Sequence, residues 1–262
     1  MDCARLRHAM PVLALLRVLP ALICAAAAAM AAMAAVAATA GTAAAAPPAV
    51  PDTMAQRALA CTGCHGPQGR SRPDGHVPRL AGKPDGYLYA QLVAFRDRRR
   101  QHDGMARLLE HLDDGMLGAL ARHFATLEVP YPAPLPPTLA AADAKRAETL
   151  VREGDARLGV PACAACHGEA LTGVAPAVPG LLGLPDSYLV GQLGAWRNDL
   201  RHARAPDCMA DVARRLPADD VARVARWLAA QPVPAGGKPA SMPPARWPAE
   251  CGGAPVPVAA SA

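Results

Sequence analysis

One five-residue pattern occurs twice in this chain, and it limits what the chain can fold around. Cys-Thr-Gly-Cys-His occupies residues 61–65, and Cys-Ala-Ala-Cys-His occupies residues 163–167. In such a segment the two thiols lie one helical turn apart, where they can add to the two vinyl groups of one haem, and the adjoining imidazole can bind the iron. A single Cys-x-x-Cys pair also fits half of a zinc site or a redox dithiol. The sequence around the two copies has to distinguish among a haem site, a zinc site and a redox dithiol.

The surroundings of the two motifs are repeated as well. Residues 87–96, Tyr-Leu-Tyr-Ala-Gln-Leu-Val-Ala-Phe-Arg, return 101 positions later as Tyr-Leu-Val-Gly-Gln-Leu-Gly-Ala-Trp-Arg. Residues 78–82 match 179–183, and residues 112–130 match 216–234. Offsets that change by only a few residues predict a duplicated domain with small loop insertions.

Composition places the boundaries of the two copies. We predict a first domain at 52–130, a proline-rich linker at 131–140, a second domain at 141–231, and an irregular tail rich in proline and glycine at 232–262. Only 3% of the residues are aromatic, too few to fill two small cores well. A covalently held haem would supply the missing apolar volume in each domain.

Each domain is expected to be all-α, because no segment shows a convincing alternating strand pattern. A helix is expected at about 141–152, and the last helix of each copy should bury one apolar face. Those faces are Leu117, Leu120 and Phe124 in the first copy, and Val221, Val224 and Leu228 in the second. The expected helix-starting caps are Asp85, Asp186, Asp113 or Asp114, and Asp219.

The N-terminus predicts export. Arg5 and Arg7 precede a stretch at 9–50 whose single charge is Arg17, and residues 1–46 fit a cleaved secretory signal peptide for the periplasm. The alternative is an uncleaved membrane anchor, since the stretch is longer than the ~20 apolar residues that span a bilayer. Its alanine-rich composition and Pro20 favour cleavage.

Cysteine usage agrees with an oxidising compartment. Of the eight cysteines, two lie in the signal and four in the motifs, which leaves Cys208 and Cys251. We predict a disulfide between them, which would hold a tail whose composition gives it no other means of binding the domain. The alternatives are a free Cys208 thiol that ligates iron and a link between two chains through Cys251.

Each iron needs a second axial ligand or an open face. Met105 and Met209 follow their motif histidines by 40 and 42 residues, correspond to each other in the repeat, and precede the last helix of each copy. Such methionines can also be core filler, but the repeated position favours iron ligation. His76, His102 and His202 have no counterparts in the repeat and are expected to be surface imidazoles, and His123 is expected to be a packing residue on the last helix.

The net charge bears on one class of partner, the nucleic acids. The net charge of +5 falls to a mildly basic value without the signal, and it does not indicate nucleic-acid binding. The run Arg-Asp-Arg-Arg-Arg at 96–100 fits a solvated helix end. Its alternatives are a partner for haem propionates or a docking patch for an acidic protein.

Taken in order, the repeated motifs resemble a known family. Two Cys-x-x-Cys-His sites, each followed by Pro-x-Leu-x-Gly, a Tyr-Leu-x-x-Gln-Leu helix, a loop methionine and a final helix, are similar to the dihaem class I cytochromes c, especially cytochrome c4. The resemblance covers residues 54–231. It implies two haem c groups attached through Cys61, Cys64, Cys163 and Cys166. It also implies that the carbonyls of Pro78 and Pro179 orient the proximal ligands His65 and His167.

The function that follows is transfer of single electrons between redox proteins, without substrate chemistry. The expected partners are a dehydrogenase or another respiratory donor and an acceptor such as a terminal oxidase. The alternative is a dihaem enzyme similar to peroxidases or thiosulfate dehydrogenases, in which a haem face is open or a cysteine thiolate binds iron. A zinc site built from the four motif cysteines is a third interpretation, which the following histidines, the export signal and the repeat disfavour.

Overall fold

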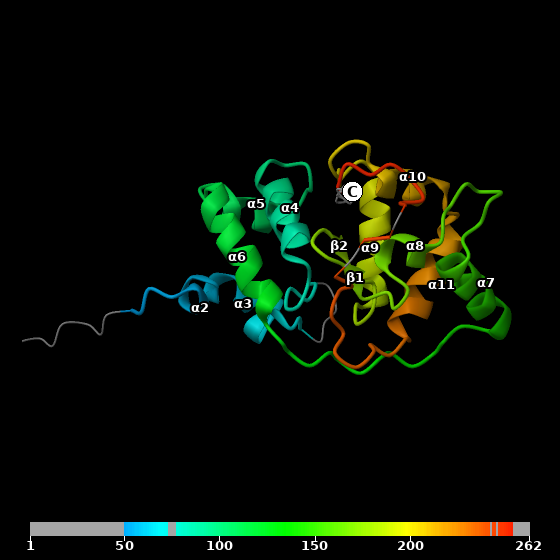
Figure 1. Cartoon of the computed structure of the whole chain (residues 1–262), viewed down its shortest axis with the longest axis horizontal. Coiled ribbons are helices and arrows are strands. Elements are labelled where there is room, and N and C mark those ends of the chain that lie inside the picture. Colours follow the sequence, from blue (N-terminus) through cyan, green and yellow to red (C-terminus); the bar gives the residue numbers. More distant parts are fainter. Residues whose placement is uncertain (1–49, 73–76, 242, 245, 254–262) are drawn as a thin grey trace, which may run out of the picture. The chain divides into compact units, whose positions relative to one another are not determined.

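A computed structural model describes residues 50–72, 77–241, 243–244 and 246–253 (Figure 1). The expected signal peptide at 1–46 and His76 lie outside the described residues. Asp52 and the described residues after it belong to one compact unit. Within the described ranges, no helix has both the length and the apolar character that a membrane crossing requires.

The first repeat is helical. Its elements are α2 (Met54–Arg57), α3 (Leu59–His65), the 3₁₀ turn η1 (Pro67–Gly69), α4 (Asp85–Arg96), α5 (Asp103–Leu109) and α6 (Asp114–Thr126). Helix α4 packs against α6 and α5, and the short α2 packs against α6 (Figure 1). The predicted face of the last helix is confirmed, because Leu117, Leu120 and Phe124 are all buried.

The second repeat has the same order of helices and one small addition. Its elements are α7 (Ala141–Arg152), α8 (Cys163–His167), β1 (Gly173–Val174), β2 (Val178–Pro179), α9 (Asp186–Arg197), α10 (Cys208–Arg215) and α11 (Ala218–Ala229). The predicted helix at 141–152 is α7, which packs on α11 together with α9. Strands β1 and β2 pair antiparallel, with Gly173 opposite Pro179 and Val174 opposite Val178. The buried face of α11 contains Val221, Val224 and Leu228, as predicted.

The predicted helix caps are only partly right. Asp113 caps α6, because its carboxylate accepts a hydrogen bond from the N–H of Met116. Asp85 is instead the first residue of α4, and its carboxylate accepts from the N–H of Gly86 inside the first turn. Asp186 has the same place in α9, and Asp219 lies within the first turn of α11. A proline holds the N-cap position in these three helices, and each aspartate still complements the helix dipole from one or two positions further on.

The linker and the tail are held by hydrogen bonds to backbone carbonyls. The N–H of Leu135 donates to the carbonyl of Ala229, and the Tyr131 hydroxyl donates to the carbonyl of Gly237. In the tail, Ala240 exchanges hydrogen bonds with the backbone of Gly173 and Ala175 beside β1. The expectation that only a disulfide could hold the tail is therefore wrong, since backbone pairing contributes as well.

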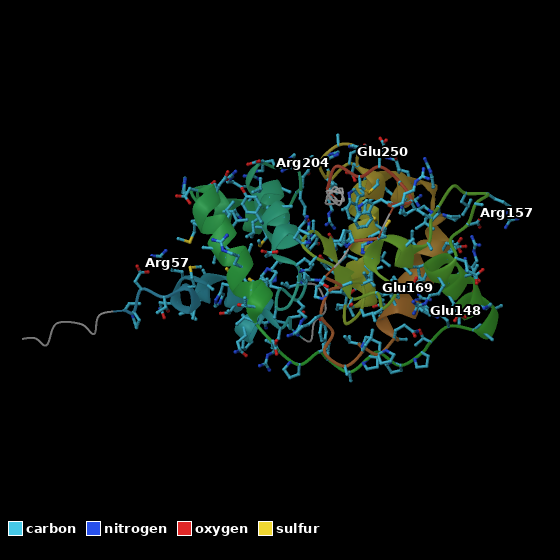
Figure 2. All side chains as sticks on the ribbon, in the orientation of Figure 1. Arg57, Glu148, Arg157, Glu169, Arg204 and Glu250 are labelled. Carbon is cyan, nitrogen blue, oxygen red and sulfur yellow. A yellow bond between two sulfur atoms is a disulfide. The ribbon has the colours of Figure 1, made fainter. Side chains whose placement is uncertain are left out.

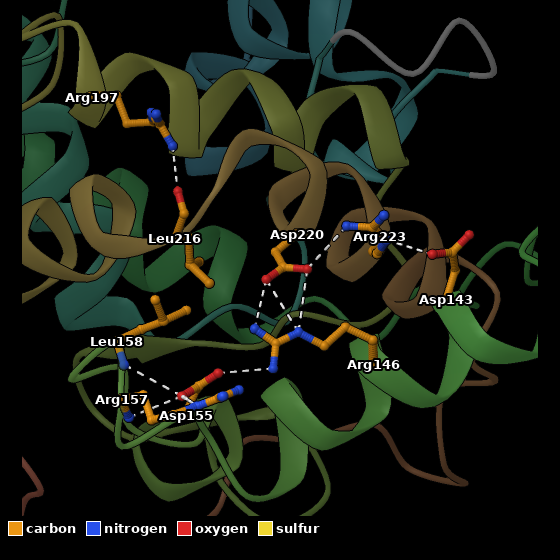
Figure 3. A network of polar contacts seen from close by, with 9 residues as sticks. All are labelled: Asp143, Arg146, Asp155, Arg157, Leu158, Arg197, Leu216, Asp220 and Arg223. Carbon is orange, nitrogen blue, oxygen red and sulfur yellow. Dashed lines mark hydrogen bonds and ion pairs between the residues drawn. The ribbon is translucent and has the colours of Figure 1, made fainter.

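A network of ion pairs joins α7 to the start of α11 (Figure 3). The Asp220 carboxylate accepts from Arg146 at 2.7 Å and from Arg223 at 3.2 Å. Arg146 also donates to Asp155 at 2.9 Å, and Arg223 donates to Asp143 at 2.6 Å. The Asp220 side chain is only 6% exposed, so its charge depends on both arginines.

Removing the central carboxylate tests how much this network stabilises the second repeat. Asp220→Ala leaves two arginines without their shared partner, and we expect it to lower the free energy of unfolding by about 2 kcal/mol. Asp219→Ala is the matched control, because Asp219 lies in the same helical turn but is exposed. Chemical unfolding followed by circular dichroism measures both. Equal losses in the two variants would contradict a specific role for the network.

The predicted disulfide between Cys208 and Cys251 is confirmed, with the two Cα atoms 5.2 Å apart. It joins the first residue of α10 to the tail, and the N–H of Gly252 donates to the carbonyl of Pro206 beside it. The bond lies directly before Met209. The tail is therefore attached to the element that carries this methionine.

Three cysteine variants test the bond and its energy. Closing a loop of 43 residues stabilises a protein by roughly 3 to 4 kcal/mol in the chain-entropy model. We expect Cys208→Ser, Cys251→Ser and the double variant to lose the same amount of unfolding free energy, since each breaks the same bond. The measurement is denaturant unfolding of the oxidised proteins without thiol reagents. Losses that add up in the double variant would show that the two cysteines act separately.

Candidate haem attachment sites

The first Cys-x-x-Cys-His motif forms the end of α3. The helix places Cys61 and Cys64 one turn apart, and His65 is its last residue. The His65 ring is buried, at 6% exposure, and its Nδ1 lies 2.8 Å from the carbonyl oxygen of Pro78. After His65 the chain turns sharply at Gly66, which has a φ of 75°. A Cβ there would lie 2.5 Å from a backbone oxygen, so this turn requires glycine.

The second motif repeats this geometry. Helix α8 spans the motif from Cys163 to His167, whose ring is 7% exposed. Its Nδ1 lies 2.7 Å from the carbonyl oxygen of Pro179, a residue of β2. The pairing of β1 with β2 fixes the position of that carbonyl. The two histidines thus meet the same kind of acceptor on different backbones. In the first repeat it lies on an irregular segment, and in the second on the paired strands β1 and β2.

The carbonyl contact determines the chemistry of each imidazole. A carbonyl can only accept, so Nδ1 carries the proton and the lone pair remains on Nε2. Burial lowers the pKa of His65, the hydrogen bond to Pro78 raises it by less, and the charge of Arg100 lowers it further. For His167 the order is burial, the bond to Pro179 and the charge of Lys83. Both rings are therefore neutral at pH 7, which is the form that binds iron.

Burial holds three of the four motif thiols in the protonated form in the folded chain. Burial raises the pKa of Cys163 to about 11, and it also raises the pKa of Cys61 and Cys166. Zinc binds the thiolate, so these thiols are poorly prepared for a zinc site. In the part of the chain that the structure describes, no three His, Cys, Asp or Glu side chains come together as a metal-binding group. The residues of each motif fit a covalently attached haem instead.

Met105 and Met209 occupy equivalent short helices, not the loops that the sequence predicted. Met105 lies in α5 and packs in a cluster with Phe95, and Met209 lies in α10 and packs with Trp196. A side chain caps each helix at its start: His102 accepts from the N–H of Met105, and Asp207 does the same for α10. Each cap fixes the first helical turn, and that turn carries the methionine.

The remaining histidines are placed as follows. His102 and His202 are exposed, as predicted. His123 lies on α6 and contacts the Phe124 ring edge-on, which agrees with a packing role. The Cys208 thiolate that the enzyme alternative proposed as an iron ligand is absent, because Cys208 is bound in the disulfide.

Sequence reasoning missed a group of residues where the two repeats adjoin. Arg201 was not recognised as the counterpart of Arg100, although the two are 101 positions apart, the offset that also relates Gln91 to Gln192. For Trp196 the sequence predicts only a place in the repeated helix. The repeated offset was the signal that could have found them.

The sequence and the structure of the chain can be compared with those of known proteins. No protein-family model matches the chain. The thiosulfate dehydrogenase electron acceptor of Thiomonas intermedia is 37% identical over 177 residues, which cover 67% of this chain and 80% of that protein. Cytochrome c4 of Pseudomonas aeruginosa is 31% identical over 174 residues, which cover 66% of this chain and 84% of that protein. The crystal structure of reduced recombinant cytochrome c4 from Pseudomonas stutzeri has a TM-score of 0.59 and 27% identity, covering 68% of this chain and 96% of the other.

The likeness to the cytochromes c4 extends over most of their length and includes both halves of the repeat. It agrees with two tandem all-α domains, each built around one attachment motif. With two Cys-x-x-Cys-His helices and two matched histidine sites, the chain belongs to the cytochrome c4 family of dihaem c-type cytochromes and carries two haem c groups.

Proposed function

We propose that this protein is a periplasmic electron carrier that takes single electrons from a dehydrogenase and delivers them to an acceptor such as a terminal oxidase. The observation that carries the proposal is the duplicated histidine geometry, with Nδ1-to-carbonyl distances of 2.8 and 2.7 Å. Two matched iron sites suit successive one-electron steps. The two predicted domains, 52–130 and 141–231, each contain a hydrophobic cluster, which supports one site in each of them.

The protein's contribution is to hold the iron ligands in place. Haem bound at each motif supplies a one-electron change between ferric and ferrous iron. The Pro78 and Pro179 carbonyls fix the tautomer of the proximal imidazoles His65 and His167 and increase their basicity. We assign Met105 and Met209 as the residues that would bind the two irons together with the histidines, since each lies in the first turn of a capped helix. A thioether ligand favours ferrous iron and raises the reduction potential, as an electron acceptor needs.

The relatives support a dehydrogenase as the electron donor. The relative from Thiomonas intermedia is named as the electron acceptor of thiosulfate dehydrogenase, and it is 37% identical to this chain. We therefore propose a thiosulfate dehydrogenase as donor, with this chain as the acceptor and not as the enzyme. The disulfide at Cys208 supports the same choice, because it removes the thiolate that a dihaem enzyme of that type would use.

A periplasmic carrier must be exported, so the proposal includes a role for the N-terminal residues. We assign residues 1–46 as a signal peptide that is cleaved on entry to the periplasm, where the haems are attached. The retained membrane anchor is the alternative for the same residues. Mass spectrometry of the intact exported protein distinguishes the two.

Methionine ligation predicts a near-infrared absorption band of the oxidised protein with the intensity of two sites. We expect Met105→Ala or Met209→Ala to halve this band, because each removes one iron–sulfur bond. Met116→Ala is the matched control, since Met116 is a partly buried methionine that packs on the core of the first repeat. A full band in either ligand variant would show that another residue binds that iron.

The donor is tested by rapid mixing. The oxidised protein should be reduced at both haems by thiosulfate together with a thiosulfate dehydrogenase, and it should stay oxidised with thiosulfate alone. Absorbance of the ferrous haem at each time point measures this. Turnover of thiosulfate by this chain alone, with ferricyanide as acceptor, would contradict the carrier and support the dihaem enzyme.

A further inference from the structure

The C-terminal tail is fixed to the second repeat at two places. Ala240 donates to the carbonyl of Gly173 at 2.9 Å and accepts from the N–H of Ala175 at 2.8 Å. Further along the tail, Cys251 is bonded to Cys208. Few of the described tail residues are buried, so the tail is held by attachments of this kind and not by packing. Each attachment lies beside an element that carries a residue of the second haem site.

The first attachment supports the acceptor of His167. Strand β1 pairs with β2 on one side, and Val174 of β1 forms a parallel bridge with Ala240 on the other. Pro179 of β2 supplies the carbonyl oxygen that lies 2.7 Å from Nδ1 of His167. A ladder of two short strands is marginal by itself, and a third partner makes it harder to open. The tail therefore stabilises the ladder that places this carbonyl.

The second attachment lies beside Met209. Cys208, which holds the disulfide, is the first residue of α10, and Met209 is the second. The end of the tail also lies against the segment before α10, where Figure 2 labels Arg204 in that segment and Glu250 in the tail. The start of this helix is therefore bound to the tail both covalently and through the backbone.

Helix α10 needs such an attachment more than its counterpart in the first repeat does. The offset of 104 positions that relates Met105 to Met209 also relates Leu109 to Ala213. Leu109 is 1% exposed, so α5 buries a large apolar side chain, whereas the buried residues of α10 are Ala210 and Ala213. Because burial of apolar area is what holds a short helix in place, α10 is fixed less firmly by its own side chains.

The disulfide occurs in the repeat that lacks the leucine. The same offset relates Cys208 to Gly104, so the first repeat cannot form the equivalent bond. A short helix with little buried area is a segment that opens locally at low cost. A covalent bond at its first residue opposes that opening. The second repeat thus has a bond where the first has packing.

We propose that the tail is a clamp for the second haem alone, holding the His167 acceptor through Ala240 and the Met209 helix through Cys251. The inference rests on the proposed function, in which His167 and Met209 bind the second iron. It also makes that iron sensitive to dithiols. A dithiol reduces the bond by attack of one thiolate on a sulfur and closure of its own ring, which leaves both cysteines as thiols and the reagent as a cyclic disulfide. The second iron then becomes open to small ligands while the first does not.

Imidazole binding to the oxidised protein tests the clamp. At saturating imidazole the rate reports how often each iron–sulfur bond opens, and Met105→Ala identifies the phase that belongs to the first haem. In the Cys208→Ser/Cys251→Ser protein we expect the second-haem phase to accelerate by at least about tenfold and the first-haem phase to change by less than about twofold.

Lys238→Gln is the matched control within the tail. It removes the exposed ion pair between Lys238 and Glu128 but keeps both attachments of the clamp. Exposed ion pairs contribute little, so neither phase should change by more than about twofold.

The attachment at β1 has its own variant. Ala240→Pro removes the N–H that donates to Gly173 and leaves the disulfide in place. A less firmly placed Pro179 carbonyl makes the His167 imidazole a weaker base, which favours ferrous iron. We expect the potential of the second haem alone to rise, with a change on the order of threefold in the ratio of ferrous to ferric iron at a fixed potential.

The finished protein can be tested if the cysteine variants do not mature. Dithiothreitol reduces the Cys208–Cys251 bond after the haems are attached, and thiol alkylation followed by mass spectrometry verifies the reduction. Carbon monoxide should then bind the ferrous protein faster at one haem only. Amide hydrogen exchange should become faster in α10 and stay the same in α5, and this measurement does not depend on which residue binds the iron.

Three results would overturn the clamp. Equal imidazole rates with and without the disulfide would show that the bond adds only global stability, and equal acceleration at both haems would show general loosening. An unchanged second-haem potential in Ala240→Pro would remove β1 from the clamp. The proposed function fails separately, because these rates remain measurable in a protein that the proposed donor does not reduce.

Discussion

The hydrogen bond between a buried imidazole and a proline carbonyl is the contact on which the rest of this structure depends. It decides which ring nitrogen carries the proton, and it leaves the other nitrogen free to bind iron. The carbonyl in the first repeat lies on an irregular segment, and in the second it belongs to β2. The helices around each site can differ in length, provided that the chain places a carbonyl oxygen beside Nδ1 of the histidine.

Duplication has produced more than two copies of one domain. Arg100 and Arg201 each bind a glutamine of the other repeat, so the polar cluster between them is complete only when both repeats are present. The second copy has also diverged. It has the buried Asp220 network, the disulfide and an indole where the first has a phenyl ring. The two iron sites therefore lie in different surroundings, although their histidines are matched.

The sequence predicted the helices, their buried faces and the disulfide, because these follow from periodic apolar residues and from the count of cysteines in an exported chain. It placed Met105 and Met209 in loops, since the helices around them are only 7 and 8 residues long, too short for a period to be recognised in the sequence. It assigned caps to Asp85 and Asp186 because the preceding prolines were not considered as N-caps. The Arg100 and Arg201 pair escaped prediction for another reason. Its contacts join residues about a hundred positions apart, and no local pattern reports them.

The burial of the two attachment motifs has a consequence for the order of events in the cell. In the folded chain both histidines are buried, and burial raises the pKa of three of the four motif thiols. A thiol must be accessible and able to ionise before it can form a thioether bond with a vinyl group. The thioether bonds therefore form more readily while the chain is still open, when burial does not hold these three thiols in the protonated form. We expect attachment to precede the closing of each domain around its haem.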